Sequence, residues 1–140
     1  MALQEDKLMK IVCIIAALLA TSVTTAGKTS NRQLTRSIYK NLDAMCRGGH
    51  GNLPSTNQAC DVRTKVSALQ RSQAAPDLGN EQANADLALS IYKDLDAMCR
   101  GGGGDRPETQ QVCVGRNKTS ALLRNMGYCW RGSWWKKCRS

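Results

Sequence analysis

The sequence is poor in the residues that metal sites and enzyme active sites need. It contains a single histidine, His50, and no two cysteines separated by two residues. Structural zinc sites use such close cysteine pairs, with histidine as the other usual ligand. Acid–base and nucleophilic catalysis need a reactive side chain held beside a partner in a pocket. We therefore expect no catalytic residue, no metal and no cofactor, and a protein that is not an enzyme.

The chain also lacks an apolar run long enough to cross a membrane. Its longest apolar stretch, residues 11–20, is shorter than the roughly 20 residues of a membrane-spanning helix. Lysines precede this stretch and the small residues 24–26 follow it, which is the layout of a secretory signal peptide. Residues 1–26 are thus predicted to be a signal peptide, with Met9 as an alternative start and a retained anchor as the lesser alternative. The mature protein is expected to be periplasmic or secreted.

Removal of that segment leaves an even number of cysteines. Of the seven in the chain, Cys13 lies in the apolar stretch. An even set in an exported chain of this size is typical of a disulfide framework. The six that remain are Cys46, Cys60, Cys99, Cys113, Cys129 and Cys138.

A duplicated phrase narrows the fifteen possible disulfide connectivities. Residues 37–69 and 90–122 are identical at 22 of 33 positions, beginning SIYKNLDAMCRGG and SIYKDLDAMCRGG. Each copy holds two cysteines at equal spacing, so a unit built twice pairs them within each copy. The predicted bridges are Cys46–Cys60, Cys99–Cys113 and, by remainder, Cys129–Cys138.

Both copies show the apolar periodicity of two amphipathic helices. The first helix of each carries Leu34, Ile38, Leu42 and Met45, or Leu87, Ile91, Leu95 and Met98. The second carries Val62, Val66 and Leu69, or Val112, Thr119, Leu122 and Met126. We expect these side chains to form a core, because two helices joined by a short loop run antiparallel.

The segment between the helices contains specific stop and start signals. Glycines 48–49 and 101–102 are placed for left-handed C-caps. In the second copy, Asp105 is the expected N-cap and Pro107 lies in the first turn of the next helix. Asp96 and Arg100, four residues apart, predict a surface ion pair, as do Asp43 and Arg47.

The predicted fold is therefore all-α: two tandem antiparallel helical hairpins, each stapled by a disulfide, followed by a disulfide-closed, Trp-rich loop. The first hairpin repeat is assigned to residues 27–71 and a polar linker to residues 72–81. Residues 82–140 hold the second repeat and the loop.

The C-terminal loop is the candidate binding site. No acidic residue follows Glu108, and all three tryptophans lie near the C-terminus. These rings either cover the open end of the hairpin core or form a binding surface, since Trp and Arg are frequent in interface hot spots. The candidate partner-binding residues are Trp130, Arg131, Trp134, Trp135, Lys136, Lys137 and Arg139.

The second copy resembles a motif of small exported proteobacterial cysteine-rich proteins of unknown function. Its parts are CRGG-x-G-D, a following C-x-x-R ending at Arg116, a G-[WY]-C at residues 127–129 and W-x-x-C at residues 135–138. Tyr128 stands where the pattern has tryptophan, and the first copy lacks the last cysteine pair. The resemblance covers residues 92–138 fully and 39–69 in part. It implies a bacterial periplasmic or secreted protein with disulfides.

The net charge of +9 favours an acidic partner. The leading hypothesis is a binding or accessory protein of the bacterial envelope that recognises an acidic protein or an anionic envelope component. A membrane-active or antimicrobial factor is the alternative, because clustered Trp and Lys suit an anionic lipid surface. An inhibitor of a wall hydrolase ranks third, since a basic protein repels a basic lysozyme. Nucleic-acid binding is not expected of an exported protein, and the oligomeric state is left open.

Overall fold

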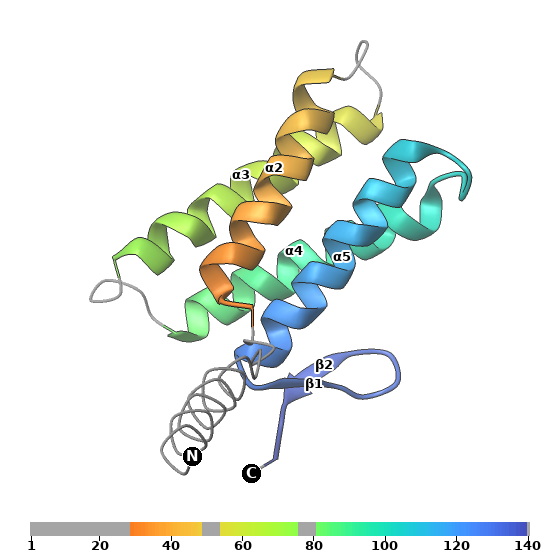
Figure 1. Ribbon diagram of the computed structural model, residues 1–140. Coiled ribbons are helices and arrows are strands. Elements are labelled where there is room, and N and C mark those ends of the chain that lie inside the picture. The colour runs from red at the N-terminus through yellow and green to blue at the C-terminus, as the bar shows by residue number, and fades with distance from the viewer. Residues whose placement is uncertain (1–28, 49–53, 76–80, 140) are drawn as a thin grey trace, which may run out of the picture.

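The computed structural model describes residues 29–48, 54–75 and 81–139. The predicted signal peptide lies outside these residues. The elements are α2 (Asn31–Gly48), α3 (Pro54–Ala74), α4 (Glu81–Gly101), α5 (Pro107–Asn125), β1 (Tyr128–Trp130) and β2 (Trp135–Lys137). Four helices and one small two-stranded sheet confirm the all-α fold class (Figure 1).

Each repeat is an antiparallel helical hairpin held by a disulfide. Cys46 is bonded to Cys60 between α2 and α3, and Cys99 to Cys113 between α4 and α5. The Cα atoms are 5.0 Å apart in both bridges, which lies within the usual range for a disulfide. The third bridge joins Cys129 to Cys138. All three predicted linkages are confirmed.

The two hairpins pack on one another around an approximate two-fold axis. Helix α2 of the first lies against α5 of the second, and α3 lies against α4. Lys118 Nζ donates to Ser37 Oγ at 2.5 Å, and Lys65 Nζ donates to Ser90 Oγ at 2.9 Å. Both lysines occupy one position of the repeated phrase, and both serines another. Such reciprocal contacts are those of a two-fold interface, here made within one chain.

One core therefore serves both hairpins. The apolar stripes predicted from the sequence face it, with the methionines and Leu87 partly buried at its margin. The largest aliphatic side chains exposed by less than 2% are Ile38, Leu42, Leu69, Ile91, Leu95, Leu122 and Leu123. Sharing a core lets each hairpin bury its apolar stripe without a large core of its own.

The helix ends differ from the predicted caps. Positive φ angles in the described residues occur at Gly127 and Gly132, so Gly101 and Gly102 form no left-handed cap. Gly102 is instead required by close packing: a Cβ atom there would stand 2.4 Å from Thr109 Oγ1. Space, rather than backbone conformation, selects glycine at this position.

The start of α5 also differs by one residue from the prediction. The N-cap is Arg106, which has an extended backbone and makes no side-chain capping bond, so the assignment to Asp105 was wrong. Pro107 occupies the first turn as predicted. Its ring disfavours helical angles in the residue before it, and this sets the helix boundary after Arg106.

Helix α3 extends three residues into the predicted linker, through Ala74. Gln73 explains the extra turn, because its Oε1 accepts from Thr35 Oγ1 at 3.0 Å and its carbonyl oxygen accepts from Arg32 Nη2 at 2.9 Å. These bonds fix the end of α3 beside the start of α2. The rest of the predicted linker, residues 76–80, lies outside the described part of the chain.

Candidate interaction site on the C-terminal hairpin

The end of α5 turns the chain back on the bundle. The amide of Met126 donates to the carbonyl oxygens of Leu122 and Leu123, which closes the last turn of the helix. Gly127 follows with φ +83°, a value that L side chains rarely adopt. The chain then leaves the helix axis and enters β1.

Strands β1 and β2 form a short antiparallel β-hairpin, which we call the C-terminal hairpin (Tyr128–Lys137). Cys129 lies opposite Lys136, and Trp130 opposite Trp135. Two residues form the turn, and the first of them, Gly132, has φ +75°. A positive φ at this position is typical of two-residue hairpin turns. The Cys129–Cys138 bridge closes the open end.

Side chains alternate between the two faces of a strand. Paired positions share a face, so the register places Tyr128, Trp130, Trp135 and Lys137 on one face and Cys129 and Lys136 on the other. By the same alternation Arg131 and Trp134, at the turn, belong with Lys136. The candidate binding residues are thus divided between two faces of the hairpin.

The first face packs on the helices through an aromatic cluster. The ring of Tyr92, on α4, lies 5.4 Å from that of Trp135 and 5.8 Å from that of Trp130. The two indoles are 5.4 Å apart in an edge-on arrangement. Edge-to-face contacts of this kind add stability beyond the buried area. Trp130 and Trp135 therefore attach the hairpin to α4.

The neighbouring Tyr128 extends this attachment. Its side chain is 8% exposed, and its hydroxyl accepts from Gln82 Nε2 at 3.3 Å. Tyr128 and Lys137 also line a cavity of about 240 Å³ at the start of α4, with Glu81, Gln82, Ala85 and Met126. The inner face is thus tied to α4 by both apolar and polar contacts.

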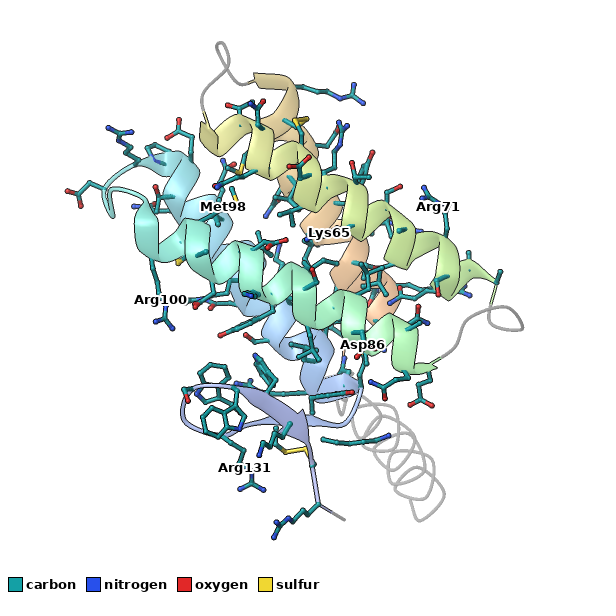
Figure 2. The ribbon with its side chains drawn as sticks, turned by 180° about the vertical axis from the view of Figure 1, so that it is seen from behind. Lys65, Arg71, Asp86, Met98, Arg100 and Arg131 are labelled. Carbon is teal, nitrogen blue, oxygen red and sulfur yellow. A yellow bond between two sulfur atoms is a disulfide. The ribbon has the colours of Figure 1, made fainter. Side chains whose placement is uncertain are left out.

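The second face points away from the helices. Trp134 is 53% exposed, the highest value among the large hydrophobic residues of the described chain. Lys136 Nζ lies 5.3 Å from the centre of its ring, a cation–π distance. Figure 2 shows Arg131 on the side of the hairpin remote from the bundle. We call Arg131, Trp134 and Lys136 the outer face.

The hairpin is strongly basic. Arg131, Lys136, Lys137 and Arg139 are exposed, and the segment from Tyr128 to Arg139 contains no acid. Within the described residues, none of these four cations takes part in an ion pair. Their charge is therefore available to an anionic partner.

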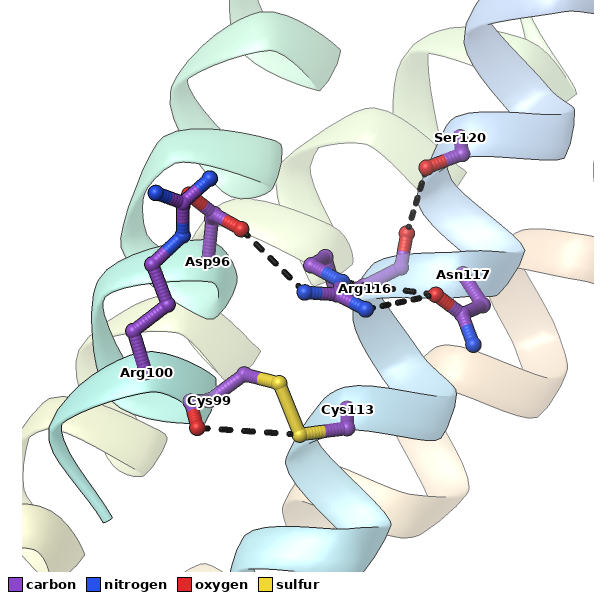
Figure 3. A network of polar contacts seen from close by, with 7 residues as sticks. All are labelled: Asp96, Cys99, Arg100, Cys113, Arg116, Asn117 and Ser120. Atoms are coloured by element: carbon purple, nitrogen blue, oxygen red, sulfur yellow. Dashed lines mark hydrogen bonds and ion pairs between the residues drawn. A yellow bond between two sulfur atoms is a disulfide. The ribbon is translucent and has the colours of Figure 1, made fainter.

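The repeated C-x-x-R motif has a structural role. Arg116 Nη1 lies 3.3 Å from Asp96 Oδ1, while Arg100 Nε lies 2.9 Å from Asp96 Oδ2 (Figure 3). The predicted pair within α4 is confirmed, and Arg116 adds a contact from α5. Its partner could not be identified from helical spacing alone, because it lies on another helix.

The first repeat builds the same network. Arg47 and Arg63 lie 2.9 Å and 3.0 Å from the two oxygens of Asp43. Partial desolvation acts to raise the pKa of Asp43, but the hydrogen bonds and charges of the two arginines outweigh it. The pKa of this carboxyl group is therefore below its ordinary value.

The largest cavity found, of about 510 Å³, lies between α3 and α4. Lys65 and Asp94 form an ion pair at its edge, and Asp61 and Met98 also line it. Its lining includes no histidine, serine or cysteine. Across the described ranges, no three His, Cys, Asp or Glu side chains gather as a metal site would require.

Comparison with protein-family models, curated proteins and solved structures gives no match. The resemblance to small exported cysteine-rich proteins therefore stays a prediction. Three disulfides place the protein outside the cytoplasm, because reducing systems keep cytoplasmic thiols unpaired. No helix in the described residues is long and apolar enough to cross a membrane.

Proposed function

We propose that the protein is a non-enzymatic, exported binding or accessory protein of the bacterial envelope, periplasmic or secreted. It recognises an acidic partner, a protein or an anionic envelope component, through the outer face of the C-terminal hairpin. The observation that carries this proposal is the division of the three tryptophans between two faces. Trp130 and Trp135 contact Tyr92, whereas Trp134 lies exposed beside Lys136.

Several features make the outer face suitable for binding. An indole ring offers a large rigid contact at low entropic cost, and tryptophan and arginine are frequent hot-spot residues. The disulfide and the turn glycine fix the strands, so little order has to be created on binding. The surrounding cations attract an acidic partner and raise its rate of association.

The test is a double substitution, Trp134→Ala with Lys136→Ala. We expect loss of binding to poly-L-glutamate, used as a plain acidic probe, and to the partner captured from periplasmic extract. The thermal midpoint should stay within a few degrees of the parent, because exposed positions usually change stability by less than about 0.5 kcal/mol. Trp135→Ala is the matched control: it removes an attachment to Tyr92 and should lower the stability of the hairpin.

Unchanged binding in the double variant, or unfolding of the whole protein, contradicts the proposal. Binding that does not weaken with salt also argues against it, because exposed charges are screened at high ionic strength.

One observation favours the membrane-active alternative. Trp134 and Trp130 are both exposed next to lysines, a composition that suits the boundary of an anionic bilayer. Leakage of dye from phosphatidylglycerol vesicles separates the two functions. A binding protein leaves the vesicles intact, whereas a membrane-active factor empties them.

A further inference from the structure

The outer side of α4 shows what the C-terminal hairpin needs as a docking surface. Ala85, Leu89 and Tyr92 share one side of α4, at spacings of four and three residues. Tyr92 contacts both inner tryptophans, and Ala85 lines the same cavity as Tyr128. The hairpin thus covers a side of the second repeat that is mostly apolar.

The equivalent side of α2 has a different character. Counting back 53 residues, Arg32 stands for Ala85, Arg36 for Leu89, and Tyr39 for Tyr92. The tyrosine is kept, but the two small or apolar residues are replaced by arginines. The hairpin lies on the α4–α5 side of the bundle, away from α2 and α3, in both Figure 1 and Figure 2.

The cations on α2 form a regular row. Arg32, Arg36 and Lys40 are exposed and follow one another every four residues, a rise of about 6 Å per step. We call them the α2 stripe. In the described part of the chain, Arg36 and Lys40 have no hydrogen bond or ion pair, and Arg32 donates to the carbonyl oxygen of Gln73. The row is therefore not neutralised by neighbouring acids.

The net charge of the molecule is unevenly distributed among the helices. Helix α2 has four basic residues and one acid, and α5 has three and one. Helix α3 has three basic residues and one acid, whereas α4 has two and four, so their charges cancel. The excess positive charge belongs to α2, α5 and the C-terminal hairpin.

We propose that the α2 stripe is a second binding surface, which takes an extended polyanion such as an acidic polysaccharide. Evenly spaced guanidinium and ammonium groups match a chain that carries an anionic group at each repeat, and bidentate contacts by the arginines strengthen the match. This surface is distinct from the outer face of the C-terminal hairpin and does not depend on that proposal.

A flat membrane is a poorer fit to the α2 stripe. An interfacial helix inserts an apolar face among the lipids. The apolar face of α2 is already in the core, since Leu34, Ile38 and Leu42 are buried. The exposed large hydrophobic residues of the described chain are Val114, Trp130 and Trp134, all outside α2. The stripe therefore offers charge without an apolar anchor.

The experiment measures the affinity of the full-length mature protein for a short heparin fragment as a function of salt. Arg36→Gln with Lys40→Gln should weaken binding at least about tenfold at low salt. It should also reduce the salt slope by up to about two released ions. Lys93→Gln with Arg106→Gln is the matched control, since it removes the same charge from exposed positions off the stripe. The control should bind within about twofold of the parent.

Three results overturn the proposal. Equal losses in both double variants mean a general charge effect. Unchanged affinity in the stripe variant means that other residues bind the polyanion. If the stripe variant instead keeps its heparin affinity but no longer sediments with phosphatidylglycerol vesicles, the surface is a membrane contact. The Trp134→Ala, Lys136→Ala variant reports on the C-terminal hairpin in the same assay, so either surface can fail alone.

Discussion

The two repeats share their interior and differ at their outer surface. Both keep the disulfide, and both keep an Asp held between two arginines. Where the second helix of the first repeat continues to Ala74, that of the second stops at Asn125 and is followed by Gly127 with positive φ. A glycine at the end of the second helix thus accompanies the added β-hairpin.

The outer surfaces follow from that difference. In the second repeat, Ala85 and Leu89 suit a side that carries the hairpin, whereas Arg32 and Arg36 suit a side left in water. The comparison teaches that duplication preserved what the core requires and left the exposed positions to diverge. Binding functions are therefore to be sought in the outer surfaces, where the copies differ.

The largest test of the comparison removes each staple in turn. Cys46→Ala with Cys60→Ala, and Cys99→Ala with Cys113→Ala, each open a loop of equal length. Each should lower the free energy of unfolding by about 3 kcal/mol, the loop-closure value for this length. Because the hairpins share one core, urea unfolding should remain a single transition. Two separate transitions in either variant mean that the hairpins are independent units.

A smaller effect is expected at the tight glycine of the second repeat. In Gly102→Ala, the new methyl group would meet Thr109, which is 8% exposed and has little room to move. We expect a loss of about 1 to 3 kcal/mol, as for other overpacked sites. Gly104→Ala is the control, since a Cβ atom there meets nothing within 4 Å.

Combining Gly102→Ala with Thr109→Ala removes the clashing atoms and should recover part of the loss seen in urea unfolding. If Gly102→Ala is as stable as Gly104→Ala, close packing is not the reason for glycine at this position.

The sequence predicted the hairpins well because their signals are local. Apolar residues three and four apart specify a helix face, and equal cysteine spacing specifies the staples. The packing of one hairpin on the other was not predicted. Its contacts, such as Lys65 with Asp94 and Lys118 with Ser37, join residues 29 and 81 positions apart, and no periodicity encodes that register.

The candidate site was located by composition but not resolved into faces. Strands β1 and β2 have three residues each, too few for an alternating pattern to be recognised. The available signal was Gly132 followed by Ser133, a pair that is typical of a two-residue hairpin turn. With that turn assigned, alternation alone separates Trp134 from Trp135.

The smallest expected effect concerns the acid limb of stability, and it tests whether the Asp43 network acts as the contacts suggest. Arg47 and Arg63 hold the pKa of Asp43 below its ordinary value of 3.8. A depressed pKa in the folded state means that the stabilisation is present above pH 3.8 and is lost as the pH falls through the lower folded value. The thermal midpoint of the parent should therefore decline below about pH 4. Asp43→Asn should show a shallower decline over the same interval, because no carboxylate remains to be protonated. Asp61→Asn is the control, since Asp61 is exposed and should leave the parent profile unchanged. Identical profiles for the parent and Asp43→Asn would show that the two arginines do not stabilise the folded state through this carboxylate.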